Sequence, residues 1–243
     1  MAEVILFRPQ DFPQAVQGQT MMPLGLVFVA TPLAARGRTV TIIDTETCAD
    51  WKNELARHVD ASTVCAGVGV MTGYQIRSAL EFSAEVKRIR DIPVVWGGIH
   101  PSILPEQTLR HPLVDIVVRG EGEEKFARIV DCLQRKEPLD AIAGIGFKRE
   151  GAAFLTPKEE RYLALDDLPF PAYHLIDMEH YLHYNLSLEW VKQRRRIMDV
   201  SMHRGCPFGC TFCYNIEFNG RTWRSMSPGK MLDYLWEINV LLI

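Results

Sequence analysis

Residues 3–140 alternate between short apolar runs and helix-patterned segments, and this alternation limits the chain to few architectures. The apolar runs at 4–7 and 116–118 are continuous, which is typical of strands buried on both faces of a sheet. Parallel strands need crossovers, and helical crossovers cover both faces. We therefore predict a doubly wound, Rossmann-like α/β domain with five parallel strands. The expected strands are 4–7, 39–43, 63–71, 93–96 and 115–118, and the expected helices are 23–36, 50–58, 75–90, 105–110 and 123–136.

The pattern changes after residue 140. Two apolar runs within 142–155 flank Arg149-Glu150-Gly151, which predicts a β-hairpin. The connector that follows contains Pro169 and Pro171, which disfavour a helix and hold the chain extended. Further on we expect a strand at 197–202, a loop at 203–224 and a helix that begins near Ser227-Pro228. The predicted divisions are 1–140, 141–195 and 196–243.

Composition and charge exclude several classes of protein. Of the 243 residues, 47% are hydrophobic and 23% are charged, as in ordinary globular proteins. The net charge of -3 gives no footprint for general binding to nucleic acid or anionic lipid, and the basic run at 192–196 is interpreted as a solvated edge. No apolar run approaches the roughly 18 residues of a membrane span. Glu3 stands where a secretory signal would carry positive charge. We expect a cytoplasmic protein without a membrane or nucleic-acid partner.

The cysteines are unevenly spaced, because Cys206, Cys210 and Cys213 share one short, glycine-rich loop. A disulfide framework would spread its cysteines along a small secreted chain. Clustered thiols in a reducing compartment instead predict a metal site. Three thiolates are one fewer than close a structural zinc site or a fully ligated iron-sulfur cluster, so one position would stay open. The alternative is a zinc site closed by His203. For Cys48, Cys65 and Cys132 we expect buried, unreactive positions.

The spacing Cys206-x3-Cys210-x-Phe212-Cys213 resembles the signature of the radical S-adenosylmethionine (SAM) superfamily. The resemblance implies that the three cysteines hold a 4Fe-4S cluster and that its free iron chelates SAM. Phe212 would lie against the adenine of SAM. An electron donor such as flavodoxin or ferredoxin would reduce the cluster, and SAM would be cleaved to methionine and a 5'-deoxyadenosyl radical.

The doubly wound domain ahead of this loop resembles the cobalamin-binding domain of B12-dependent radical SAM proteins. The segments that carry the resemblance are 23–26, 97–101, 120–123 and 168–171. By that resemblance Thr72, Gly97, Gly98 and Gly120 line the nucleotide tail of cobalamin. The family pattern Asp-x-His-x-x-Gly is not kept, because Asp11-Phe12-Pro13 has no histidine to ligate cobalt. His100 is interpreted as a structural turn residue rather than a substitute ligand.

The expected function is that of a cobalamin-dependent radical SAM enzyme that methylates or cyclises a small-molecule substrate. No catalytic residue can be named. Residues 197–243 are too few for a partial (β/α) barrel, since each strand-helix-strand unit needs about 30 residues, so we expect either a fragment of a longer enzyme or a truncated product. The alternatives are a non-catalytic module that binds cobalamin or another tetrapyrrole, a zinc-binding structural module, and a tRNA-modifying radical enzyme that uses the basic run.

Overall fold

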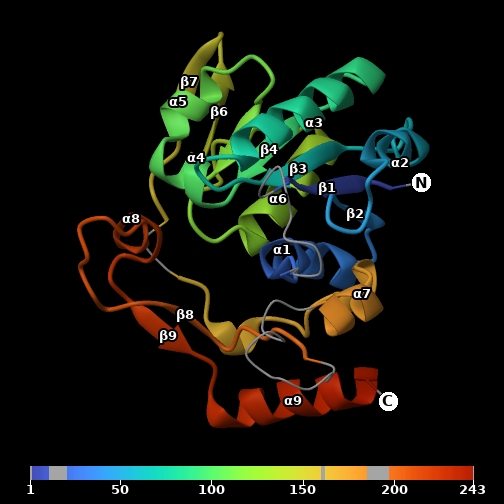
Figure 1. Cartoon of the computed structure of the whole chain (residues 1–243). Helices are drawn as coiled ribbons and strands as arrows, with labels where there is room; N and C mark the ends of the chain where they lie inside the picture. Colours follow the sequence, from blue (N-terminus) through green and yellow to red (C-terminus); the bar gives the residue numbers. More distant parts are fainter. Residues whose placement is uncertain (1, 11–20, 160–161, 185–196, 243) are drawn as a thin grey trace.

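The computed structural model describes residues 2–10, 21–159, 162–184 and 197–242, and at its centre lies one sheet with helices on both faces (Figure 1). The strand order is β2-β1-β3-β4-β5-β6-β7. The first five strands pair in parallel, whereas β6 and β7 are antiparallel additions at the β5 edge. The strands are β1 (Val4–Arg8), β2 (Val40–Asp44), β3 (Cys65–Gly69), β4 (Val94–Gly97), β5 (Ile116–Val118), β6 (Ile145–Arg149) and β7 (Ala152–Leu155).

Two hydrophobic cores lie on opposite faces of the sheet. Helices α2 (Trp51–His58) and α3 (Gln75–Ile89) cover one face, where Leu55, Phe82 and Val86 are buried. Helices α1 (Leu24–Ala35) and α6 (Glu123–Arg135) cover the other. The predicted doubly wound α/β fold, with its five parallel strands, is confirmed. The short helices α4 (Ile99–Ile103) and α5 (Pro105–Leu109) follow β4, and α4 was not predicted.

The hairpin after residue 140 enlarges the predicted sheet from five strands to seven. Strand β6 pairs with β5, so that Gly146 faces Val117. A Cβ atom at Gly146 would lie 2.5 Å from Leu155 and 2.9 Å from Leu109. The missing side chain therefore lets the hairpin close against α5. The predicted divisions of the chain stay predictions, but these strands continue the first sheet.

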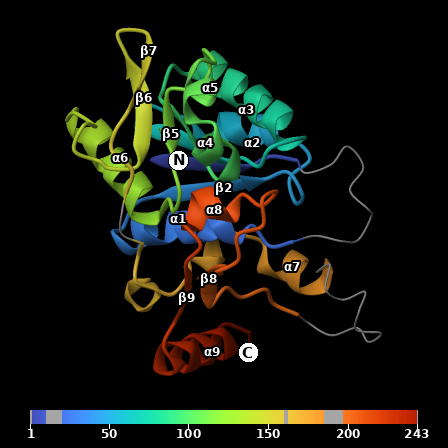
Figure 2. The same cartoon turned by 90° about the vertical axis from the view of Figure 1, so that its left-hand side faces the viewer.

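A third core covers the outer side of α1. It combines Val27 and Phe28 of α1 with Tyr173, Tyr181 and Tyr234. The Tyr173 and Tyr234 hydroxyls lie 2.6 Å apart, and the Ala172 N–H donates to Thr31 Oγ1 at 3.0 Å. Figures 1 and 2 show α1 between the sheet and this outer layer. The elements of the layer are two 3-10 turns (Leu165–Asp167 and Tyr173–Leu175), α7 (Met178–Tyr184) and α9 (Pro228–Leu242).

The predicted strand at 197–202 is wrong. Met198 and Met202 pack against the third core, and residues 197–202 do not form a strand. Ile197 N–H donates to Leu182, and the Met202 carbonyl accepts from Met226 N–H. The two methionines thus pack against a core, and strand pairing begins only at His203. The predicted helix near Ser227-Pro228 is confirmed as α9, and the Ser227 hydroxyl accepts from Lys230 N–H at 3.2 Å.

The predicted loop 203–224 contains regular structure of its own. Strand β8 (His203–Gly205) pairs antiparallel with β9 (Trp223–Ser225), and α8 (Asn215–Asn219) lies between them. The cysteines therefore sit inside a closed hairpin. Among the described helices, none has the length and apolarity that crossing a lipid bilayer requires.

Candidate functional site

The carboxyl ends of β3 and β4 meet through hydrogen bonds around Val70. Val70 N–H donates to the Gly97 carbonyl at 2.8 Å, and His100 N–H donates to the Val70 carbonyl at 2.9 Å. Gly98 has a φ of +92°, and a Cβ there would lie 3.0 Å from the Val70 backbone. Thr72 Oγ1 lies 3.1 Å from His100 Nδ1. The structure thus brings Thr72, Gly97 and Gly98 to one edge of the sheet.

His100 is part of this turn. Its side chain is buried, and burial lowers the pKa of its imidazole. Its backbone N–H and its ring both contact neighbouring loop residues, Val70 and Thr72. These contacts fit the interpretation of His100 as a structural turn residue.

Ser102 joins Gly120 to the same edge, and its role could not be predicted from sequence. Its hydroxyl donates to the Gly98 carbonyl at 2.6 Å and accepts from Gly120 N–H at 2.9 Å. The four residues predicted to contact cobalamin, Thr72 among them, therefore lie at the carboxyl ends of β3, β4 and β5. Ligands of doubly wound sheets bind beyond these strand ends.

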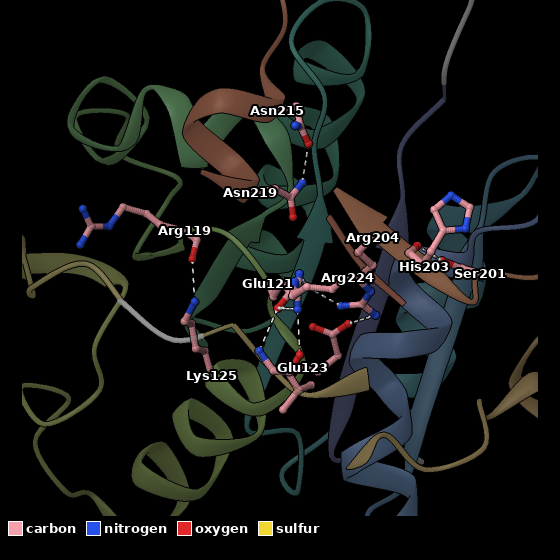
Figure 3. Close-up of polar contacts among 11 residues, drawn as sticks. Arg119, Glu121, Glu123, Lys125, Ser201, His203, Arg204, Asn215, Asn219 and Arg224 are labelled. Atoms are coloured by element: carbon pink, nitrogen blue, oxygen red, sulfur yellow. Dashed lines mark hydrogen bonds and ion pairs between the residues drawn. The ribbon is translucent and has the colours of Figure 1, made fainter. Parts of the chain in front are cut away.

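The cysteine loop rests on a chain of two buried asparagines (Figure 3). Asn219 Nδ2 donates to Asn215 Oδ1 at 2.8 Å, and Asn215 Nδ2 donates to the Cys206 carbonyl at 2.9 Å. Cys213 N–H donates to the Cys210 carbonyl at 3.0 Å. Sequence analysis missed both asparagines, although they directly follow the cysteine motif.

The six cysteines are free thiols. Cys210 is exposed, Cys206 and Cys213 are half-buried, and the side chain of Phe212 is 91% exposed. Three free thiols on one loop are a donor set that fits an iron-sulfur cluster. Within the described residues, however, no three His, Cys, Asp or Glu side chains lie close enough together to hold a metal ion. This holds for the three cysteines and for the set that includes His203, so either site would need the loop to tighten.

The isolated cysteines differ from those of the loop. Cys65 is fully buried in the sheet, and burial raises the pKa of its thiol to about 12. The predicted buried position is therefore confirmed for Cys65, and the raised pKa fits the predicted low reactivity, since the thiolate is the reactive form. Cys48 and Cys132 are only half-buried.

Two arginines of the cysteine hairpin reach two glutamates that follow β5 (Figure 3). Arg204 lies 3.0 Å from Glu121 Oε1 and 2.6 Å from Glu123 Oε1. Arg224 Nη2 lies 2.6 Å from Glu121 Oε1, and its Nη1 donates to the Leu163 carbonyl at 2.7 Å. The cysteine loop is thereby tied to the strand end that carries Gly120.

The pKa shifts of Glu121 and Arg204 favour their charged forms. Burial acts to raise the pKa of the Glu121 carboxyl, but Arg224 and Arg204 outweigh it and lower that pKa. Burial likewise acts to lower the pKa of Arg204, and Glu123 and Glu121 raise it instead. Sequence analysis did not find this cluster. In the sequence, only the position of Arg204 directly before Gly205-Cys206 could have indicated a residue that supports the cysteine loop.

A cavity of about 500 Å³ lies beside this cluster. Its lining includes Ser102, Gly120, Glu121, Tyr162 and Phe218. Lys125 also lines it, donates to the Arg119 carbonyl at 2.9 Å and has a pKa lowered by burial (Figure 3). Of the four predicted cobalamin contacts, Gly120 lines this cavity and Thr72, Gly97 and Gly98 do not.

Two sequence features lie outside the described residues. They are the loop with Asp11-Phe12-Pro13 and the basic run at 192–196.

Comparison with known proteins shows what this chain resembles. Residues 14–130 match the B12-binding domain. An uncharacterized methyltransferase of Pyrococcus horikoshii is 29% identical over 224 residues, which are 90% of this chain and 46% of the relative. The anaerobic magnesium-protoporphyrin IX monomethyl ester cyclase of Synechocystis is 26% identical over 224 residues, which are 90% of this chain and 43% of that enzyme.

The fold agrees. The radical SAM methyltransferase TsrM from Kitasatospora setae, solved with tryptophan and a SAM analogue, superposes with a TM-score of 0.73 at 19% sequence identity. The likeness covers 100% of this chain and 46% of TsrM. The chain is similar to cobalamin-dependent radical SAM proteins, and over residues 14–130 it matches the B12-binding domain. It spans about half the length of the relatives it matches.

Proposed function

We propose that this chain holds cobalamin and a 4Fe-4S cluster side by side for a radical SAM reaction. The observation that carries the proposal is the direct joining of the cysteine hairpin to the Gly120 strand end through Glu121 and Glu123. Cys206, Cys210 and Cys213 would ligate the cluster. When bound, the cluster supplies the electron that cleaves SAM.

The residues of the chain have distinct roles in this proposal. Gly97, Gly98 and Gly120 allow close approach of a ligand at the strand ends, and Thr72 adds a hydroxyl there. Phe212 extends its ring into solvent beside the thiols and is available to stack on an adenine. Asn215 holds the backbone of Cys206 in place. The site would serve methyl transfer to, or cyclisation of, a small-molecule substrate, with electrons from a flavodoxin or ferredoxin in the cytoplasm.

Anaerobic reconstitution with iron and sulfide tests the cluster. We expect iron and sulfide to bind in equal amounts with broad visible absorption, and we expect Cys210→Ala to lose most of this absorption. Cys132→Ala, which removes a thiol outside the loop, is the matched control and should keep it. Zinc bound without iron or sulfide would defeat the assignment and favour the zinc module.

Binding of hydroxocobalamin tests the other half of the proposal. We expect the chain to retain hydroxocobalamin through gel filtration, and Gly98→Val to lose it because the new side chain would collide with Val70. Dithionite and SAM then separate an enzyme from a binding module. Formation of 5'-deoxyadenosine supports the enzyme, whereas cobalamin retention without it supports the module.

A further inference from the structure

Glu121 lies at the centre of the contacts between the cysteine hairpin and the sheet. Its carboxylate accepts from Arg204 and Arg224 and from Leu163 N–H, and its side chain is 9% exposed. Arg204 and Arg224 are 16% and 17% exposed. Charged groups with so little contact with water keep their interactions unscreened by salt. This joint between the cysteine hairpin and the sheet is therefore less sensitive to salt than a surface ion pair.

The hairpin itself depends on this carboxylate. Arg204 and Arg224 face each other across β8 and β9. Like charges directly opposite each other on paired strands destabilise the pair. The Glu121 carboxylate pairs with both guanidinium groups, and this attraction offsets the repulsion between them. Glu123 is a second partner for Arg204.

A continuous series of hydrogen bonds leads from this joint to the predicted cobalamin edge. Gly120, directly before Glu121, donates to Ser102 Oγ, and Ser102 donates to the Gly98 carbonyl. On the other side Arg204 directly precedes the Gly205-Cys206 step. The predicted cobalamin edge, the Gly120 loop and the anchor of the cysteine loop are therefore direct neighbours.

We propose that Glu121 is a positioning residue that couples ligand binding at the Gly120 loop to order in the cysteine loop. The inference rests on the proposed function for the identity of the ligand, cobalamin. Coupling between two sites is reciprocal by thermodynamic necessity. Order in the cysteine loop, once imposed, would tighten the binding of cobalamin by the same factor.

Hydrogen exchange over residues 203–225, measured with and without hydroxocobalamin, tests the coupling. We expect hydroxocobalamin to slow exchange there by about fivefold in the wild-type chain, within the usual range of coupling between sites. In Glu121→Gln the slowing should disappear. The matched control is Glu124→Gln, since Glu124 is 49% exposed and pairs with Arg36 instead.

The comparison of variants decides the outcome. A folded Glu121→Gln protein that keeps the full slowing overturns the coupling. If this variant does not fold, Arg224→Lys takes its place under the same criterion, because lysine keeps the charge but cannot reach Glu121 and Leu163 together.

Failure of the proposed function would look different. If the wild-type chain does not bind hydroxocobalamin, the ligand assignment fails and the joint is judged on the ligand-free protein. Faster exchange at 203–225 in Glu121→Gln than in Glu124→Gln then supports Glu121 as the anchor that orders the cysteine hairpin. Equal exchange in the two variants overturns it.

Discussion

At the scale of single residues, the cysteine loop depends on Gly205. Its φ of +85° lies in the left-handed region, and a Cβ atom there would lie 1.9 Å from the Thr222 carbonyl oxygen. No side chain fits at that distance from backbone. The glycine thus lets β8 end and the chain turn directly into Cys206.

Gly205→Ala should therefore open the hairpin. We expect the backbone strain to lower the free energy of unfolding by about 1–3 kcal/mol, and the clash with the Thr222 carbonyl to lower it further. The iron bound after reconstitution should also fall. Urea unfolding and iron analysis measure the two effects.

Gly229→Ala is the control, because a Cβ at Gly229 in α9 meets nothing within 4 Å. It should stabilise α9 by about 0.5–1 kcal/mol. Unchanged stability and unchanged iron content in Gly205→Ala would contradict the assigned role of the glycine.

At the scale of elements, the sequence predicts helices and strands correctly where the spacing of apolar residues matches the faces that the fold buries. The five parallel strands and α1, α2, α3 and α6 follow from apolar runs and amphipathic spacing. The predicted strand at 197–202 is wrong, because only Met198 and Met202 pack against a core there and strand pairing begins at His203. Partners distant in the sequence, such as Glu121 and Arg224, could not be predicted, because no local pattern encodes an ion pair formed by folding.

Gly146→Ala tests the attachment of the β6–β7 hairpin to the sheet. The new methyl group would lie 2.5 Å from Leu155, 2.9 Å from Leu109 and 3.0 Å from Val117. We expect overpacking to cost about 1–3 kcal/mol in the free energy of unfolding, measured in urea. Gly25→Ala, where a Cβ meets nothing within 4 Å, should not lose stability. A neutral Gly146→Ala would mean that the hairpin does not pack on β5 and α5 as described.

At the scale of the whole molecule, a buried polar cluster joins the outer layer to the sheet. Tyr181 of α7 donates its hydroxyl to Asp44 Oδ2, and Arg8 donates to the Tyr181 oxygen at 3.2 Å. Arg8 and Asp44 end the neighbouring strands β1 and β2 and lie 3.3 Å apart. Burial raises the pKa of Tyr181, so its hydroxyl stays protonated and able to donate.

Tyr181→Phe should therefore weaken the attachment of the outer layer to the sheet. A hydrogen bond to a charged group contributes about 1.5–3 kcal/mol to the free energy of unfolding. We expect Tyr181→Phe to lower that free energy by about this amount, measured by urea unfolding. Tyr74→Phe, at a ring that is 51% exposed, should change stability by less than about 0.5 kcal/mol. Equal stability of the two variants would show that the cluster does not hold the layers together.

Helix α1 makes the two layers inseparable. Its sequence has no charged residue, and it buries Leu26 and Leu33 toward the sheet and Val27 and Phe28 toward the outer layer. A recombination event that moved the B12-binding sheet alone into another protein would leave one side of this helix as a bare apolar strip. Such a strip promotes aggregation. A transferred sheet would therefore keep α1 covered only if the outer-layer residues of the 3-10 turns, α7 and α9 moved with it.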